Sequence, residues 1–235
     1  MPSLKSGKVV YVITNILHVV INMNEFFDPE AAVEIHRRNL PHWNQGATTY
    51  FVTFHLADSL PARQLAALDA ERKRWLALNQ PPHNERQTSE YRRTFSKRIH
   101  EWLDAGYGSC ILASQEVFTL VQGVLKFFAE ERYALGEHIV MPNHVHALVK
   151  PLQGHELHRI LHSWKSFSAH QINKLTGSRG AVWHRESFDH IVRSPNQLSR
   201  IEQYIRDNPN SLPLEKRGYL DGQRLPRTWA ESKAP

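Results

Sequence analysis

The sequence predicts an α+β fold, in which an antiparallel sheet of four to five strands packs against several helices. Stretches rich in β-branched and aromatic residues, which favour strands, occur at four places between longer segments with helical periodicity. Two of these stretches are joined only by Pro142-Asn143, and so short a connection allows only an antiparallel pair. The chain has 235 residues, of which 41% are hydrophobic and 22% charged, a composition typical of globular proteins.

The strands are predicted where β-branched and aromatic residues are bounded by turn-forming residues. The first lies far from the others along the chain, because a long helical region separates it from the hairpin. Another helix separates the hairpin from the last strand. The predicted strands are residues 49–56, 133–141, 144–150 and 187–193.

Helices are predicted where apolar residues recur every three or four positions. In one of them Val117, Val121 and Val124 share one side, so this helix should pack against the sheet. Pro81-Pro82 separates the first two helices, since proline lacks the N–H that a helix interior requires. We expect the helices to cover one face of the sheet. They are predicted at residues 62–78, 89–103, 114–131, 156–175 and from 195 to near 208.

The chain is predicted to form a single domain of residues 23–212, since no repeat, low-complexity tract or long linker divides it. Residues 61–110 form a helical insertion in this domain, and residues 213–235 form a C-terminal tail. Residues 1–22 contain an apolar run that is too short to span a bilayer. We expect them to be an extension from an upstream start assigned in error, with Met23 as the true first residue.

Charge and cysteine usage narrow the classes of partner and cofactor. Lysine and arginine number 29 against 23 acidic residues, and this net charge of +6 favours a polyanionic partner. The single cysteine, Cys110, excludes an internal disulfide and a cysteine-based zinc site, and is consistent with the cytoplasm. A bound metal would therefore have histidine, asparagine or carboxylate ligands. No membrane partner is expected.

His144 and His146 are the first candidate site residues. They lie two positions apart in a predicted strand, so both side chains point to the same face of the sheet. Two imidazoles on one rigid strand face form half of a site for a divalent metal. The alternative interpretation is a pair of structural histidines that form hydrogen bonds at a sheet edge.

The last predicted helix presents a second pair of polar side chains. Ser194, Pro195 and Gln197 form a capping-box start, with serine at the N-cap and glutamine at the third helical position. Tyr204 and Asn208 are four residues apart, so their side chains lie along the same edge of the helix. As alternatives, the tyrosine is a half-buried packing residue and the asparagine is a helix C-terminal residue before a proline.

Four motifs follow one another along the chain: Met141 to His146, Trp164-Lys165, Trp183 to Arg193 and Tyr204 to Pro209. In this order they resemble the REP-associated tyrosine transposases. These proteins are single-tyrosine HUH endonucleases of the IS200-like transposase superfamily. The resemblance covers roughly residues 39–212 and is specific because the motifs occur together. Two features depart from the family pattern: the insertion, and His184, which stands where a glutamine commonly follows the tryptophan.

The resemblance implies a ferredoxin-like sheet and a DNA-cleaving site. His144, His146 and Asn208 match the family's metal ligands, which would hold Mg²⁺ or Mn²⁺, and Tyr204 matches the nucleophile. The implied activity is cleavage and rejoining of single-stranded DNA beside a REP-type hairpin, through a 5′-phosphotyrosine intermediate. We expect a cytoplasmic, nucleoid-associated protein that acts as a monomer or homodimer.

Basic residues near the motifs are candidate contacts to DNA phosphates. Two other functions are compatible with the same residues. One is a domesticated protein that binds hairpin DNA without cleaving it, and the other is a metal-dependent phosphodiesterase that uses water while Tyr204 is structural. The candidate DNA-binding residues are Lys165, Arg179, Arg193, Arg200 and Arg206.

Overall fold

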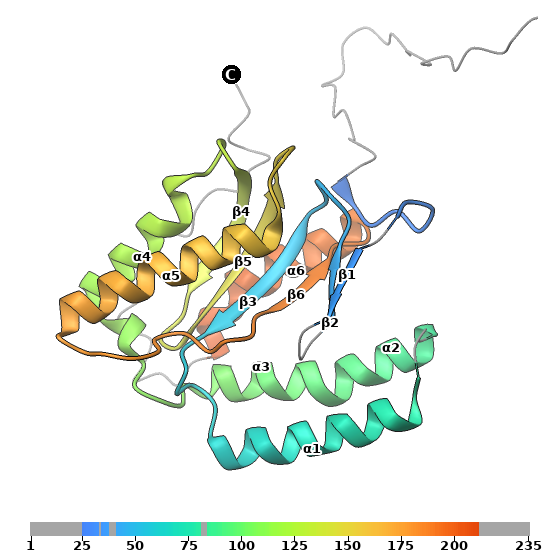
Figure 1. Cartoon of the computed structure of the whole chain (residues 1–235), viewed down its shortest axis with the longest axis horizontal. Coiled ribbons are helices and arrows are strands. Elements are labelled where there is room, and N and C mark those ends of the chain that lie inside the picture. The colour runs from blue at the N-terminus through green and yellow to red at the C-terminus, as the bar shows by residue number, and fades with distance from the viewer. Residues whose placement is uncertain (1–24, 33, 38–40, 81–83, 212–235) are drawn as a thin grey trace, which may run out of the picture.

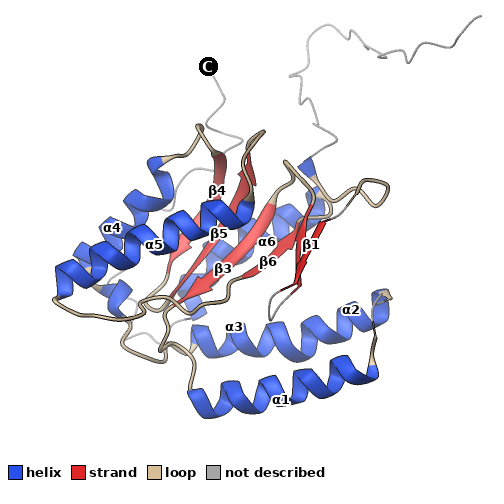
Figure 2. Cartoon of the chain, in the orientation of Figure 1, coloured by secondary structure: helices blue, strands red, loops and turns tan. Residues whose placement is uncertain are grey.

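The computed structural model describes residues 25–32, 34–37, 41–80 and 84–211. Its centre is a four-stranded antiparallel sheet with strand order β4-β5-β3-β6 (Figures 1 and 2). The predicted α+β class is thus confirmed, and the strands lie within about one to two residues of the predicted bounds. They are β3 (Tyr50–His55), β4 (Tyr133–Val140), β5 (His144–Pro151) and β6 (Phe188–Ile191).

The connections between these strands are those of a ferredoxin-like fold. The chain runs from β3 through α4 (Gln115–Phe127) to the β4–β5 hairpin, and then through α5 (Leu157–Thr176) to β6. Each helical crossover joins strands that are not neighbours, so the two β-α-β units interleave. Both helices cover the same face of the sheet, as Figure 1 shows.

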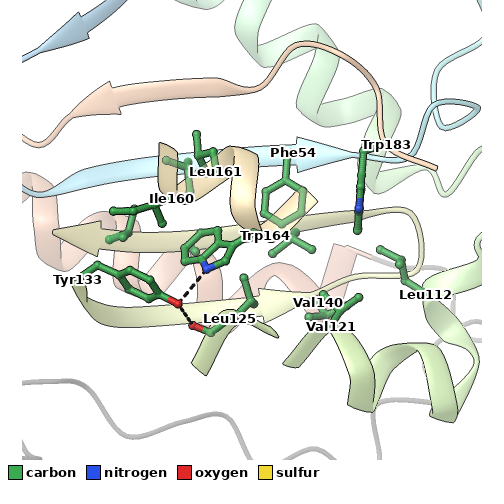
Figure 3. Packing of buried hydrophobic residues seen from close by; sticks show 14 of the residues in the cluster. Phe54, Leu112, Val121, Leu125, Tyr133, Val140, Ile160, Leu161, Trp164 and Trp183 are labelled. Atoms are coloured by element: carbon green, nitrogen blue, oxygen red, sulfur yellow. Dashed lines mark hydrogen bonds between the residues drawn. The ribbon is translucent and has the colours of Figure 1, made fainter. Parts of the chain in front are cut away.

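The main hydrophobic core lies between this face and the two helices (Figure 3). Phe54 of β3 contacts both Trp164 of α5 and Trp183, with ring centroids 6.3 and 4.8 Å apart. The buried Tyr133 hydroxyl donates to the Leu125 carbonyl at 2.8 Å and accepts from the Trp164 indole N–H at 2.9 Å. The polar atoms of these large side chains are therefore paired inside the core.

The opposite face of the sheet is also covered, which corrects the expectation of helices on one face only. Helix α6 (Pro195–Asp207) packs there through Ile201 and Ile205. Phe51 and Leu148 point to this second face and contribute to its apolar cluster. Because alternate strand residues on both faces are apolar, the sheet needs a helix on each side to remove them from water.

The insertion consists of α1 (Ala62–Leu78), α2 (Glu85–Tyr91), a π-helical turn (Arg92–Ser96) and α3 (Lys97–Asp104). Figure 1 shows α1 alongside α2 and α3, and these segments enclose a separate apolar cluster. The second helical stretch begins earlier than the predicted residue 89. Asn84 and Gln87 explain this start, since each side-chain oxygen accepts the other residue's backbone N–H.

Other differences from the prediction are local. The hairpin of β1 (Glu34–Arg37) and β2 (Pro41–Asn44) was not predicted. Helix α4 ends four residues early, close to Glu130, whose φ of +66° is incompatible with a right-handed helix. Short 3₁₀ segments lie at Ile111–Ala113 and Asn208–Ser211. The predicted extension and tail, residues 1–22 and 213–235, lie outside the described residues.

None of the helices in the described part of the chain is both long and apolar enough to cross a membrane.

Candidate functional site

His144 and His146 lie on the face of β5 that α6 covers. Their side chains have no solvent-exposed surface, and their Nε2 atoms are 3.1 Å apart. This confirms that the two rings share one face, as strand alternation predicted. Their position in the sheet interior also corrects the alternative of histidines at a sheet edge, because β5 is paired on both sides.

The outer ring nitrogens are held by neighbouring side chains. His144 Nδ1 lies 2.7 Å from Asn143 Oδ1, while Asn143 Nδ2 donates to the Tyr107 carbonyl at 3.0 Å. This second bond fixes the amide orientation, so His144 Nδ1 must carry the hydrogen and Nε2 must present a lone pair. His146 Nδ1 lies 2.7 Å from the hydroxyl of Thr53, which stands opposite it on β3.

Burial keeps both imidazoles neutral. It holds the pKa of His144 and the pKa of His146 well below their ordinary value, and the neighbouring rings, including His100, lower both further. Neutral imidazole is the form that binds divalent metals. Adjacent ligands about 2.1 Å from an octahedral ion are about 3 Å apart, which agrees with the 3.1 Å between the Nε2 atoms. The pair therefore fits a divalent cation.

Helix α6 brings Tyr204 to the histidine pair. The phenol oxygen lies 3.3 Å from His146 Nε2, and the Tyr204 ring packs edge-on against Phe51. The N-terminus of this helix is capped as predicted, because Ser194 Oγ accepts the Gln197 N–H at 3.2 Å. The glutamine side chain closes the cap differently, by accepting the N–H of Arg193 instead of that of Ser194.

An ion pair fixes the other end of α6 to the sheet. Arg206 Nη1 lies 2.9 Å from Oε1 of Glu137, a carboxylate of β4 that is only 2% exposed. Charged hydrogen bonds of this kind are costly to break when one partner is buried. Together with the Ser194 cap, this contact sets the position from which Tyr204 reaches the histidines.

Asn208 and Asp104 complete the polar cluster. Asn208, the residue at the C-terminal end of α6, is buried and donates from Nδ2 to Asp104 Oδ1 at 3.3 Å. The same carboxylate oxygen is 3.8 Å from His144 Nε2. Burial raises the pKa of Asp104 to about 6, because removal from water disfavours its charged form.

The Tyr204 phenol is neutral in this arrangement. Burial raises its pKa above the ordinary value near 10, and the Asp104 carboxylate raises it further, whereas the hydrogen bond with Asn208 acts in the opposite direction. Loss of the phenol proton would therefore be favoured by positive charge placed beside His146.

The candidate DNA-binding residues do not form one cluster. Arg200 and Arg206 share α6 with Tyr204, and Arg193 lies just before this helix, where its guanidinium packs over the Phe27 ring. Lys165 of α5 donates to the Arg185 carbonyl and to the Ser187 hydroxyl, while Arg179 is exposed in the loop after α5. Their role in DNA binding stays a prediction.

Four residues beside the site were not predicted: Thr53, Asn143, Asp104 and His100, whose ring lies 5.6 Å from that of His146. Asn143 belongs to the motif Met141 to His146, so its position beside His144 could have signalled a supporting role. Thr53 could have been found by aligning the first strand with the hairpin. Asp104 had no local signal, because only the placement of the insertion brings it to the histidines.

Comparison with known proteins finds a family match for the region that contains the predicted site. The model of IS200-like transposases matches residues 111–208, which include His144, His146, Tyr204 and Asn208. This match confirms the predicted resemblance for that part of the chain. None of the curated proteins matches the chain significantly.

Two solved structures align with the chain over most of its length. One is described as a REP-associated tyrosine transposase bound to a REP hairpin; it has a TM-score of 0.38 and 15% identity, covering 78% of this chain and 74% of that one. The other is a candidate transposase from Deinococcus radiodurans R1, with a TM-score of 0.36 and 15% identity. This second alignment covers 68% of this chain and 89% of the Deinococcus chain.

Proposed function

We propose that this chain, whose residues 111–208 match the IS200-like transposases, is a metal-dependent single-stranded DNA endonuclease and strand transferase. Its substrate would be DNA flanked by a REP-type hairpin. Tyr204 would be the nucleophile, and His144, His146 and Asn208 would hold Mg²⁺ or Mn²⁺. The observation that carries the proposal is the distance of 3.3 Å between the Tyr204 hydroxyl and His146 Nε2, two groups 58 residues apart in sequence.

Each residue of the site would have a different role in cleaving a phosphodiester. The Tyr204 oxygen would attack phosphorus, giving a 5′-phosphotyrosine and a free DNA 3′-hydroxyl that takes up a proton. A divalent cation at the histidine pair would polarise the scissile phosphate and lower the pKa of the nearby phenol. Asn143 and Thr53 would keep both Nε2 lone pairs directed at the cation by holding the outer ring nitrogens.

The covalent intermediate makes rejoining possible. The phosphotyrosine ester conserves the energy of the phosphodiester, so another 3′-hydroxyl can attack it and release Tyr204. Lys165, Arg179, Arg193, Arg200 and Arg206 would neutralise phosphates of the bound strand. We further propose that residues 23–212 form one domain, and that the protein is cytoplasmic, nucleoid-associated and monomeric or homodimeric.

Trapping of the covalent intermediate tests this proposal. The protein is incubated with Mn²⁺ and a labelled single strand that carries a hairpin, and is then separated under denaturing conditions. The wild type should give a labelled protein–DNA adduct and a shortened strand. Tyr204→Phe should abolish both, because phenylalanine has no nucleophilic oxygen. Tyr91→Phe, which changes a tyrosine of the insertion, is the matched control and should keep the adduct.

The other outcomes identify the alternatives. An adduct that persists in Tyr204→Phe would show that another residue is the nucleophile. Strand cleavage without any adduct would favour a phosphodiesterase that uses water, and hairpin binding without cleavage would favour the domesticated binding protein. His144→Ala should remove cleavage while the circular dichroism spectrum stays that of the folded protein; an unfolded variant would return the histidines to a structural role.

A further inference from the structure

Asp104 lies beside the histidine pair although it comes from the helical insertion and not from the sheet or α6. We propose that its carboxylate is a further ligand of the divalent cation that His144 and His146 would hold. This inference rests on the metal centre of the proposed function and adds one protein ligand to it. The residue lies outside the segment that matches the transposase family, residues 111–208.

The position of the carboxylate is close to that of a ligand. Asp104 Oδ1 is 3.8 Å from His144 Nε2, and the ligand atoms of Asp104, His144 and His146 all lie within 4.8 Å of one another. Neighbouring ligands of an octahedral ion are about 3 Å apart and opposite ligands about 4 Å apart, so these distances lie within about 1 Å of those in an octahedral shell. Over the residues that the structure describes, no other group of histidine, cysteine or acidic side chains has such geometry.

The charge of the site also calls for an acidic ligand. The two imidazoles are neutral and fully buried, so alone they would leave the double charge of the cation uncompensated in a dry environment. The Asp104 side chain is 21% exposed and supplies one negative charge at the edge of this environment. Two imidazoles with one carboxylate form a ligand set that holds divalent metals and leaves positions open for substrate.

The end of α3 is held in place on both sides of this contact. Leu103 is completely buried in the apolar cluster of the insertion, together with Ile99 one turn earlier. On the other side, the Asn208 amide donates to the carboxylate oxygen at 3.3 Å. The carboxylate therefore stays beside the histidines through packing and through a hydrogen bond, so ligand binding requires little reorganisation.

Mn²⁺ binding by isothermal titration calorimetry tests this ligand without depending on cleavage. The wild type should bind Mn²⁺, His146→Ala should lose it, and Asp104→Asn should bind at least about tenfold more weakly. Glu101→Gln is the matched control, because it removes one negative charge from the same helix one turn earlier, where the side chain is 58% exposed. Its affinity should stay within about twofold of the wild type.

A second variant separates ligation from a general electrostatic or structural effect. In Asp104→Cys the thiolate should restore binding of Cd²⁺ but not of Mn²⁺, since soft ligands prefer soft metals. Equal Mn²⁺ binding by Asp104→Asn and the wild type, with loss in His146→Ala, would overturn the role of Asp104 and leave the proposed metal centre standing. Equal binding by His146→Ala and the wild type, or no binding by the wild type, would overturn both.

Discussion

The two faces of the central sheet differ in kind although the same strands build them. On β5, Val145 and Ala147 point into the core beneath α4 and α5, whereas His144 and His146 point towards α6 and the end of α3. The first face is held by apolar packing, and the second combines apolar residues with a cluster of paired polar groups. The fold therefore separates stability from chemistry by strand alternation, and substitutions on one face should leave the other largely unaffected.

The largest loss of stability is expected from a substitution on the sheet face that α4 and α5 cover, the apolar face. Phe54→Ala removes a side chain that is 1% exposed and contacts two buried tryptophans. The lost burial and the cavity should lower the free energy of unfolding by about 3–5 kcal/mol, measured by urea denaturation. Phe167→Ala, at a position of α5 that is 56% exposed, is the control and should change it by less than about 0.5 kcal/mol. Similar losses in both variants would contradict the assignment of the core.

Acid should destabilise the protein through histidines on both faces. Burial lowers the pKa of His55, beside the site, to about 3, and the pKa of His138, beneath α4, to about 4. Unfolded histidine titrates near pH 6.5, so the unfolded chain binds more protons below that value. The stabilisation that these neutral, buried histidines provide is complete above about pH 6.5, and it is lost as the pH falls towards the pKa of each histidine in the folded protein. Each histidine should remove about 1.4 kcal/mol per pH unit in this window.

Two substitutions show how much of this acid sensitivity comes from the face of the sheet beneath α4. Between pH 6 and 5, unfolding of His138→Gln should take up about one proton fewer than unfolding of the wild type. The unfolding free energy of the variant should therefore depend less steeply on pH. His170→Gln, an exposed position of α5, should retain the wild-type dependence. If His138→Gln shows the wild-type slope, the histidine of the apolar face does not contribute and the acid effect belongs to the other face alone.

The smallest loss of stability is expected from a substitution at the start of α6. Ser194→Ala removes the side-chain oxygen that accepts the Gln197 N–H, and should cost about 1 kcal/mol of unfolding free energy. Because this cap helps to position Tyr204, adduct formation should also slow. Ser199→Ala, an exposed serine of the same helix, should cause neither change, since alanine is a better helix former than serine. A loss at Ser199 equal to that at Ser194 would argue against the cap.

Sequence patterns predicted the parts of the site that depend on local geometry. Strand alternation placed His144 and His146 on one face, and helical spacing placed Tyr204 and Asn208 along one edge. Sequence could not predict Asp104 as their neighbour, because that contact depends on how the insertion packs. The covering of both sheet faces was missed for a similar reason: apolar residues such as Phe51 and Leu148 show that a face is buried, but not which helix covers it.

The hairpin of β1 and β2 was missed because its residues carry little strand signal. Glu34–Arg37 contains two charged residues, and Pro41–Asn44 begins with a proline, which is rare inside sheets. Pairing between the two short segments outweighs these local preferences. The start of α2 was missed because the reciprocal cap of Asn84 and Gln87 differs from the serine or threonine signature of the usual capping box.

The complete burial of His144 and His146 has a consequence for access by DNA. A phosphate cannot reach nitrogen atoms that have no exposed surface unless a covering element moves. Helices α3 and α6 both contribute to this cover, since the His100 ring and the Tyr204 ring each pack edge-on against the His146 ring. Cleavage by the proposed mechanism would therefore begin with a gating step, and the resting protein would keep its metal-binding nitrogens shielded from unintended targets.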